Sequence, residues 1–201
     1  MDHKDFSNFN WLNESSIRFE NEAMVLYAPK DSDFFCNNGT VSEEGITPSS
    51  LTNAPFFYTE VSGDFVMRVK AEHDFKDIYD SASVMVMKDL KVWAKLCFEL
   101  TDFNTHAVVS VVTNPLSDDA NGNNIDGNSV WLQITRVGQA FAFHYSLDGD
   151  QFYMVRFFNL PVDETVKVGF VPQAPNGNGG DRSYSDFSLE KKTVKNIRAG
   201  V

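Results

Sequence analysis

The sequence predicts an all-β fold, and we favour a jelly-roll sandwich of two antiparallel sheets. Apolar residues recur with a period of two along most of the chain, and turn residues separate the alternating runs. No run of ten or more residues keeps a helical period. About a dozen short strands must bury two sheet faces, which a sandwich or a barrel achieves.

The strands can be justified in order along the chain. Residues 64–72 alternate cleanly, with Phe65, Met67 and Val69 on one side. Residues 81–88 and 107–113 are apolar on both faces, as expected of central strands that are covered on each side. The full set of expected strands is 16–20, 23–28, 55–60, 64–72, 81–88, 93–100, 107–113, 130–136, 140–146, 151–158, 165–171 and 183–190.

Turns and loops agree with this order. Residues 137–139 and 147–150 each separate two alternating runs and contain glycine, so both are expected to be hairpin turns. Residues 114–129 and 172–183 are long, rich in Gly, Asn and Asp, and carry no pattern, so we expect loops there. Long loops in compact domains are often functional, although mobile decoration at one end of a sandwich is an equal alternative.

Composition limits the function classes. The 201 residues fit one all-β domain spanning 1–201. A net charge of −11, from 28 acidic and 17 basic residues, argues against nucleic acid and anionic membranes as partners. Cys36 and Cys97 are too few for a disulfide framework and have no metal-ligand spacing. The first residues show no signal-peptide pattern, so we expect a cytoplasmic protein without a metal or cofactor.

The two faces of the expected strand 93–100 differ in character. One is an ordinary core face, made of Ala94, Leu96 and Phe98. The other combines a large aromatic ring with a thiol and two opposite charges, in Trp93, Lys95, Cys97 and Glu99. The two charged residues are about 13 Å apart at their Cα atoms, so each needs another partner, a ligand or water.

This mixed face suits a sugar, whose C–H face stacks on an aromatic ring while its hydroxyls exchange hydrogen bonds. Trp131 and Gln133, on the expected strand 130–136, are further candidates for the same surface. His106 begins the next strand and is a candidate as well, although a capping or structural role is more common for such a residue. The alternative is a packed sheet face closed by cross-strand ion pairs.

The sequence contains no complete catalytic or metal-binding motif. Sandwich glucanases carry alternating acids, Glu-x-Asp-x-x-Glu, whereas Glu99 is the only acid within 93–100. A Gly-x-Ser-x-Gly elbow is absent, and the four histidines lack metal-ligand spacing. Asp119, Asn121 and Asn123 are similar to the start of a calcium loop, but its glycine and final glutamate are missing. A catalytic function is therefore the less favoured interpretation.

Several short motifs together resemble one family. In order they are Asp31-Ser-Asp33-Phe34-Phe35, Pro55-Phe-Phe57-Tyr58, Gly63-Asp64-Phe65, Tyr79-Asp80, Trp93-x-Lys95-x-x-x-Glu99, Ser110-Val-Val112-Thr113, Arg136, Tyr145-Ser146-x-Asp148-Gly149, Val155-Arg156, Gly169-x-x-x-x-x-Pro175 and Asp186-Phe187. From about residue 7 to 190, this pattern is similar to concanavalin A-like domains of the regulation-of-enolase-protein type, a family of unknown function. Where we expect the family motif to carry Trp, this chain has Phe35.

The resemblance implies a concanavalin A-like jelly roll of two curved sheets, whose related lectins and glucanases use the concave sheet for carbohydrate. Glucanase activity is not implied, because the required acids are absent. Tyr58 and Arg156, from two of the motifs, complete the candidate ligand-binding set on the concave face. That set is Tyr58, Trp93, Lys95, Glu99, His106, Trp131, Gln133 and Arg156.

Three hypotheses follow. The first is a carbohydrate-binding or sensing domain without catalysis, based on the mixed face of Trp93, Lys95 and Glu99. The second is an intracellular protein-interaction or regulatory module, consistent with the acidic balance and the enolase-regulator resemblance. The third is a weak glycoside hydrolase in which Glu99 acts as general acid or base.

Overall fold

Strands make up nearly all of the regular structure. The computed structural model describes residues 6–37 and 50–201. Within this part of the chain, no helix is long and apolar enough to cross a membrane. The strands are β1 (Asn10–Leu12), β2 (Ile17–Glu20), β3 (Ala23–Ala28), β4 (Phe34–Phe35), β5 (Leu51–Thr52), β6 (Phe56–Ser62), β7 (Phe65–Glu72), β8 (Ser81–Asp89), β9 (Val92–Leu100), β10 (His106–Thr113), β11 (Ser117–Asn124), β12 (Ser129–Val137), β13 (Ala140–Ser146), β14 (Tyr153–Asn159), β15 (Thr165–Gln173) and β16 (Gly180–Glu190).

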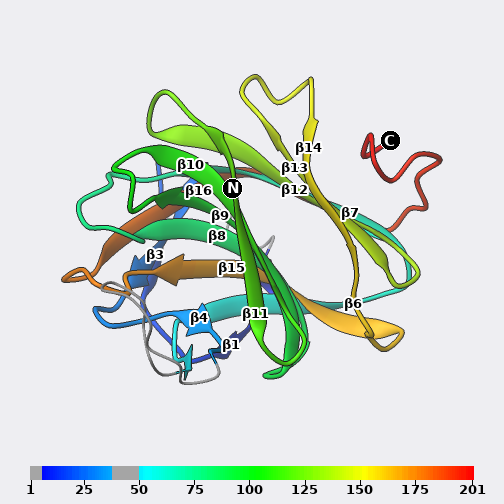
Figure 1. The fold of residues 1–201 in the computed structure, drawn as a ribbon, viewed down its shortest axis with the longest axis horizontal. Helices are drawn as coiled ribbons and strands as arrows, with labels where there is room; N and C mark the ends of the chain where they lie inside the picture. Colours follow the sequence, from blue (N-terminus) through cyan, green and yellow to red (C-terminus); the bar gives the residue numbers. More distant parts are fainter. Residues whose placement is uncertain (1–5, 38–49) are drawn as a thin grey trace.

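Two seven-stranded antiparallel sheets face each other (Figure 1). The first, here called the β9 sheet, has the order β1-β6-β15-β8-β9-β10-β11, and the second, the β12 sheet, has the order β14-β13-β12-β7-β16-β3-β2. In Figure 1, β15, β8 and β9 run side by side through the middle of the β9 sheet. The predicted all-β sandwich of two antiparallel sheets is confirmed.

The core lies between the sheets, and the alternation of the sequence places it there. Leu96 and Phe98 of β9 are fully buried in one cluster with Leu132 and Ile134 of β12. The expected core face of β9 is thus confirmed. Completely burying one such aliphatic or aromatic side chain contributes roughly 1.5–3 kcal/mol, so this layer is the main source of stability.

The outward-facing side of the β9 sheet, here called the outer face, is set by strand register. Residues paired across neighbouring strands point to the same side, so one row can be followed from β6 to β11. That row is Tyr58, Gly169, Met85, Lys95, Val111 and Asp119. The β4 and β5 segment covers part of this face, since Phe34 and Ala54 pack with Trp93. β9 is accordingly buried on both sides.

The expectation of a loop over 114–129 is wrong. Most of this stretch forms β11, which pairs with β10 from Thr113↔Ser117 to Ala107↔Asn124. Its side chains are mostly exposed, so the strand carries no hydrophobic alternation that the sequence could reveal. The backbone hydrogen bonds to β10 hold it, and it forms the edge of the β9 sheet.

The stretch 172–183 is only partly a loop. β15 continues to Gln173 and β16 begins at Gly180, which leaves a short connection between them. The β15 end pairs with the start of β8, through Gln173↔Ser81. This pairing places Gln173 next to β8, on the same side of the sheet as Glu99 of β9.

Both expected hairpin turns are confirmed. Gly138 has a positive φ of 60° between β12 and β13, as a tight hairpin requires. In the β13–β14 turn, the Asp148 carboxylate accepts the backbone N–H groups of Asp150 and Gln151, each at 2.9 Å. Gly149 has φ 84°, and a Cβ there would lie 2.9 Å from the Trp131 ring. Trp131 therefore packs on this glycine.

Candidate functional site

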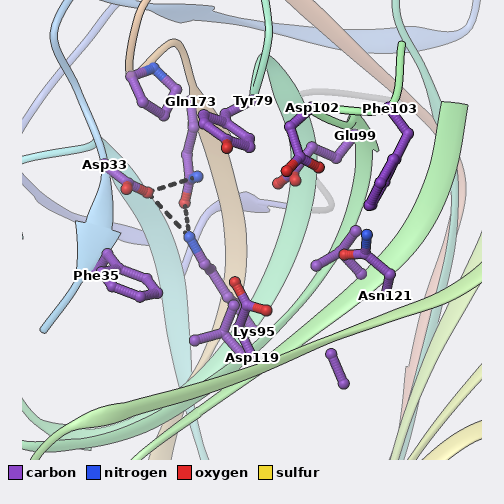
Figure 2. A pocket seen from close by; sticks show the side chains of 14 residues that line it. Asp33, Phe35, Tyr79, Lys95, Glu99, Asp102, Phe103, Asp119, Asn121 and Gln173 are labelled. Atoms are coloured by element: carbon purple, nitrogen blue, oxygen red, sulfur yellow. Dashed lines mark hydrogen bonds and ion pairs between the residues drawn. The ribbon is translucent and has the colours of Figure 1, made fainter. Parts of the chain in front are cut away.

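A cavity of about 310 Å³ opens on the outer face of the β9 sheet, and we call it the outer-face pocket. Its floor comes from β9, β10 and β11, and its walls come from the segment before β4, the end of β15 and the loops on either side of β8 and β9. The lining residues are Asp33, Phe35, Tyr79, Lys95, Glu99, Asp102, Phe103, Val109, Val111, Asp119, Ala120, Asn121, Gln173 and Pro175. Figure 2 shows most of them.

A hydrogen-bonded trio fixes one side of the pocket (Figure 2). The Lys95 ammonium donates to Asp33 Oδ1 and to Gln173 Oε1, each at 3.0 Å. Gln173 Nε2 donates to the same Asp33 oxygen at 2.8 Å, and the backbone N–H of Phe34 does so at 2.7 Å. Lys95 thus finds its partner in a distant segment and not in Glu99. We call Lys95, Asp33 and Gln173 the Lys95 trio.

The Lys95 trio lies in a desolvated position. The side chain of Lys95 is 4% exposed and that of Asp33 is 12% exposed. Burial lowers the pKa of the Lys95 ammonium, but the nearby acidic groups, Asp33 foremost, together outweigh it, and the pKa lies above its usual value. A buried cation of this kind is held charged by its partner and has two hydrogen-bond directions already in use.

Glu99 is the second ionisable residue of β9 that lines the pocket, and its hydrogen bonding and pKa shift differ from those of Lys95. The residue is 9% exposed, and among residues 6–37 and 50–201 no group hydrogen-bonds its carboxyl. Burial raises its pKa to about 8, Lys95 opposes the rise, and the charges of Asp33, Asp119 and Asp102 add to it. At pH 7 Glu99 is therefore mainly a neutral acid that can both donate and accept a hydrogen bond.

Aromatic side chains stand around these polar groups. Figure 2 shows Phe35 and Phe103 on opposite sides of these polar side chains, with Tyr79 between the Lys95 trio and Asp102. Phe103 is 74% exposed on the loop after β9. Tyr79 has a positive φ of 70°, a strained conformation for a bulky side chain. Strain of this kind gathers at binding sites.

Trp93 does not line the outer-face pocket, although it lies on the same face of β9 as Lys95. It is fully buried, and its ring meets Phe34 edge-on with centroids 5.8 Å apart. The β4 segment covers it, and Cys36 and Met87 pack in the same cluster. Trp93 therefore cannot act as the expected aromatic platform, because no ligand can reach its ring.

Trp131 and Gln133 lie on the other sheet, so the expected single surface is wrong for both. They belong to β12, whose outward side faces away from the outer-face pocket. Gln133 Oε1 accepts a 2.5 Å hydrogen bond from Arg68, and its amide nitrogen contacts His144 and the carbonyl of Gly200. The C-terminal segment covers this position.

Tyr58 and His106 belong to the β9 sheet but stay outside the pocket. Tyr58 shares the row of Lys95 on β6, three strands away, and packs against Phe56 with ring centroids 5.1 Å apart. His106 stacks on Phe75 at 4.1 Å, and its Nδ1 lies 2.8 Å from the carbonyl oxygen of Gly127. The structural role that we considered for His106 fits this contact.

Arg156 joins the edges of the two sheets. It extends from β14 and binds the Asp118 carboxylate of β11 at 2.8 Å and the Asp118 carbonyl at 3.2 Å. Its position is outside the outer-face pocket. Of the eight candidate residues, Lys95 and Glu99 are the two that line the pocket.

A metal ion has no cage in the described chain. Across residues 6–37 and 50–201, no group of three or more His, Cys, Asp or Glu side chains is arranged to hold one. The acids in the pocket come from separate strands and loops, and Asp33 is already bound to Lys95.

Residues 11–192 match the model of a family described as "Protein of unknown function (DUF1349)". The chain belongs to this family. A yeast relative of the DUF1349 chain, "Regulation of enolase protein 1" of Saccharomyces cerevisiae, is 26% identical over 190 residues, covering 92% of this chain and 90% of the yeast protein. The resemblance to the regulation-of-enolase type is confirmed.

Solved structures show the same fold. A functionally unknown protein from Saccharomyces cerevisiae superposes with a TM-score of 0.82 and 24% identity, covering 94% of this chain and 99% of that one. The carbohydrate binding module CBM66 from Bacillus subtilis gives 0.58 and 10%, covering 93% and 98%. The GH43 protein BlXynB from Bacillus licheniformis gives 0.60 and 12%, with 94% of this chain and 39% of the enzyme covered. The DUF1349 fold is thus shared with binding modules and with parts of glycosidases.

Most pocket residues escaped the sequence analysis, yet signals for some of them were present. Asp33 and Tyr79 stand in the motifs of the family resemblance, without any role attached. Asp119 and Gln173 fall in the two long stretches expected to be loops, for which a functional role and mobile decoration were equal alternatives. Phe103 and Asp102 follow the strand 93–100 directly and had no signal beyond that position.

Proposed function

We propose that this DUF1349 chain is a non-catalytic carbohydrate-binding protein and that the outer-face pocket holds the sugar. The observation that carries the proposal is a cavity of about 310 Å³ in which the Lys95 trio stands among Phe35, Tyr79 and Phe103. Ligand pockets span about 300–1,000 Å³, so this one suits a monosaccharide or the end of a glycan. Preformed polar groups next to exposed aromatic rings are what a sugar requires.

The fold also supports carbohydrate binding. CBM66 of Bacillus subtilis, whose name describes it as a carbohydrate binding module, has the same sandwich over nearly its whole length. The neutral carboxyl group of Glu99 adds a hydrogen-bond donor and an acceptor to the pocket, and no described residue hydrogen-bonds it. A sugar hydroxyl, which is both donor and acceptor, satisfies such a group without leaving a charge buried.

Phe103 provides the most direct test. Replacing it with alanine is expected to weaken sugar binding at least about tenfold, because one aromatic contact is lost. The residue is 74% exposed, so the fold should be unaffected. Titration calorimetry against neutral, amino and acidic monosaccharides and short oligosaccharides measures the effect.

The matched control is Leu147→Ala, since Leu147 is 66% exposed on the β13–β14 hairpin of the other sheet. It should bind like the wild type. The proposal fails if no sugar binds the wild-type protein, or if Phe103→Ala and Leu147→Ala bind equally well.

A second candidate is slow glycoside hydrolysis, which the pKa of Glu99 favours. A general acid must hold its proton near neutral pH, and a pKa of about 8 provides that. If the chain hydrolyses chromogenic glycosides, Glu99→Gln should lower the rate about 100-fold or more. Equal rates for the two proteins remove Glu99 from any such reaction and leave binding as the function.

A further inference from the structure

The outer-face pocket has an uneven charge balance. Among the residues that the structure describes, four carboxyl groups line it, those of Asp33, Glu99, Asp102 and Asp119, against one cation, Lys95. The Lys95 ammonium is bound to Asp33 at 3.0 Å and is therefore already neutralised. What the pocket presents to a ligand is acidic, and an anionic sugar would meet repulsion there.

Glu99 is the feature that indicates what the pocket accepts. It is 9% exposed and lines the cavity, and none of the described residues hydrogen-bonds its carboxyl. A carboxyl group that is mostly buried, faces a cavity and has no described protein partner is available to pair with a ligand group that enters. Figure 2 shows Asp102 close to Glu99 in the view, with the ring of Tyr79 beside them.

Carboxyl groups surrounded by aromatic rings form the usual environment for an organic cation. Tyr79, Phe35 and Phe103 line the same cavity as the acids, and the faces of aromatic rings attract ammonium groups. We propose that the outer-face pocket binds a sugar with a free amino group, and that its ammonium pairs with the Glu99 carboxylate. This inference deepens the proposed carbohydrate-binding function and rests on it.

Binding is then coupled to proton release. In the free protein Glu99 holds a proton, because burial raises its pKa to about 8. The groups that act on it are Lys95 of β9, which lowers the pKa, and Asp33, Asp119 of β11 and Asp102, which raise it. An arriving ammonium favours the carboxylate, so the Glu99 proton leaves to solvent and the ion pair forms.

The experiment compares each hexosamine with its uncharged counterparts. Glucosamine, N-acetylglucosamine and glucose share one ring, as do the corresponding galactose and mannose derivatives. Calorimetric titration at about pH 6, where the amine is protonated, should show one hexosamine binding at least about tenfold tighter than its N-acetyl and hydroxyl counterparts. Repeating it in two buffers of different ionisation enthalpy should show proton release.

Three variants test which residues cause the amine preference and the proton release. Glu99→Gln keeps the shape of the neutral acid and should abolish both the preference for the amine and the proton release. Asp119→Asn should weaken the preference, since Asp119 lines the pocket. Asp118→Asn, its neighbour on β11, should behave like the wild type because Asp118 pairs with Arg156 outside the pocket.

The outcomes separate the two proposals. If neutral sugars bind as tightly as hexosamines, or if Glu99→Gln keeps the amine preference, recognition of the amine is wrong while carbohydrate binding stands. If no sugar of either kind binds, both proposals fail.

Discussion

Replacing Lys95 with methionine is expected to lower the free energy of unfolding by about 3–5 kcal/mol. The change keeps most of the length of the side chain but leaves the Asp33 carboxylate, whose side chain is 12% exposed, without its cation. A buried charge that loses its partner is far more costly than a lost surface ion pair. Urea unfolding followed by tryptophan fluorescence measures the loss.

Two controls make the result specific. Lys192→Met breaks the surface ion pair with Glu190, 2.8 Å long, and should cost less than about 1 kcal/mol. The double variant Lys95→Met with Asp33→Asn should recover much of the loss, because no buried charge remains. If Lys95→Met costs no more than Lys192→Met, the Lys95 trio does not hold the pocket in the way described.

Replacing Glu99 with glutamine is expected to stabilise the protein at alkaline pH. The folded pKa of about 8 lies above the value of 4.5 for the unfolded chain, so the folded state holds the proton more tightly. The wild-type protein therefore loses stability as pH rises from about 4.5 through about 8. Glutamine stays neutral, and above pH 8 the variant should be more stable by a few kcal/mol.

The measurement is the difference in unfolding free energy between wild type and Glu99→Gln from about pH 5 to pH 9. Taking this difference cancels what other titrating groups contribute to the pH dependence of the unfolding free energy, above all the contribution of His73. Burial lowers the His73 pKa to about 2, so this residue removes stability as pH falls through the usual histidine range. A difference that is flat with pH would mean that Glu99 is ionised in the folded protein.

The sequence predicts β9 well and its partners poorly. Alternation alone separates the core face with Leu96 from the polar face with Lys95 and Glu99, and the structure keeps that separation. The partner of Lys95 could not be predicted, because Asp33 is 62 residues away and reaches it only through the covering β4 segment. The same segment buries Trp93.

Two errors have separate physical causes, and the first is that a sequence reports alternation but not the sheet to which a strand belongs. Trp131 and Gln133 alternate as Lys95 and Glu99 do, yet β12 lies in the opposite sheet. β11 has no alternation at all, because an exposed edge strand is held by backbone hydrogen bonds. The single domain, the cytoplasmic location and the protein-interaction hypothesis stay predictions.

Amide chemical shifts of the isotope-labelled protein, recorded during titration with the panel of neutral, amino and acidic sugars, test most directly whether the outer-face pocket binds carbohydrate. We predict that at least one sugar shifts the signals of Lys95, Glu99 and Phe103 and leaves the outward side of β12 around Trp131 unchanged. Shifts confined to the β12 sheet, or none with any sugar, would contradict the assignment of this pocket.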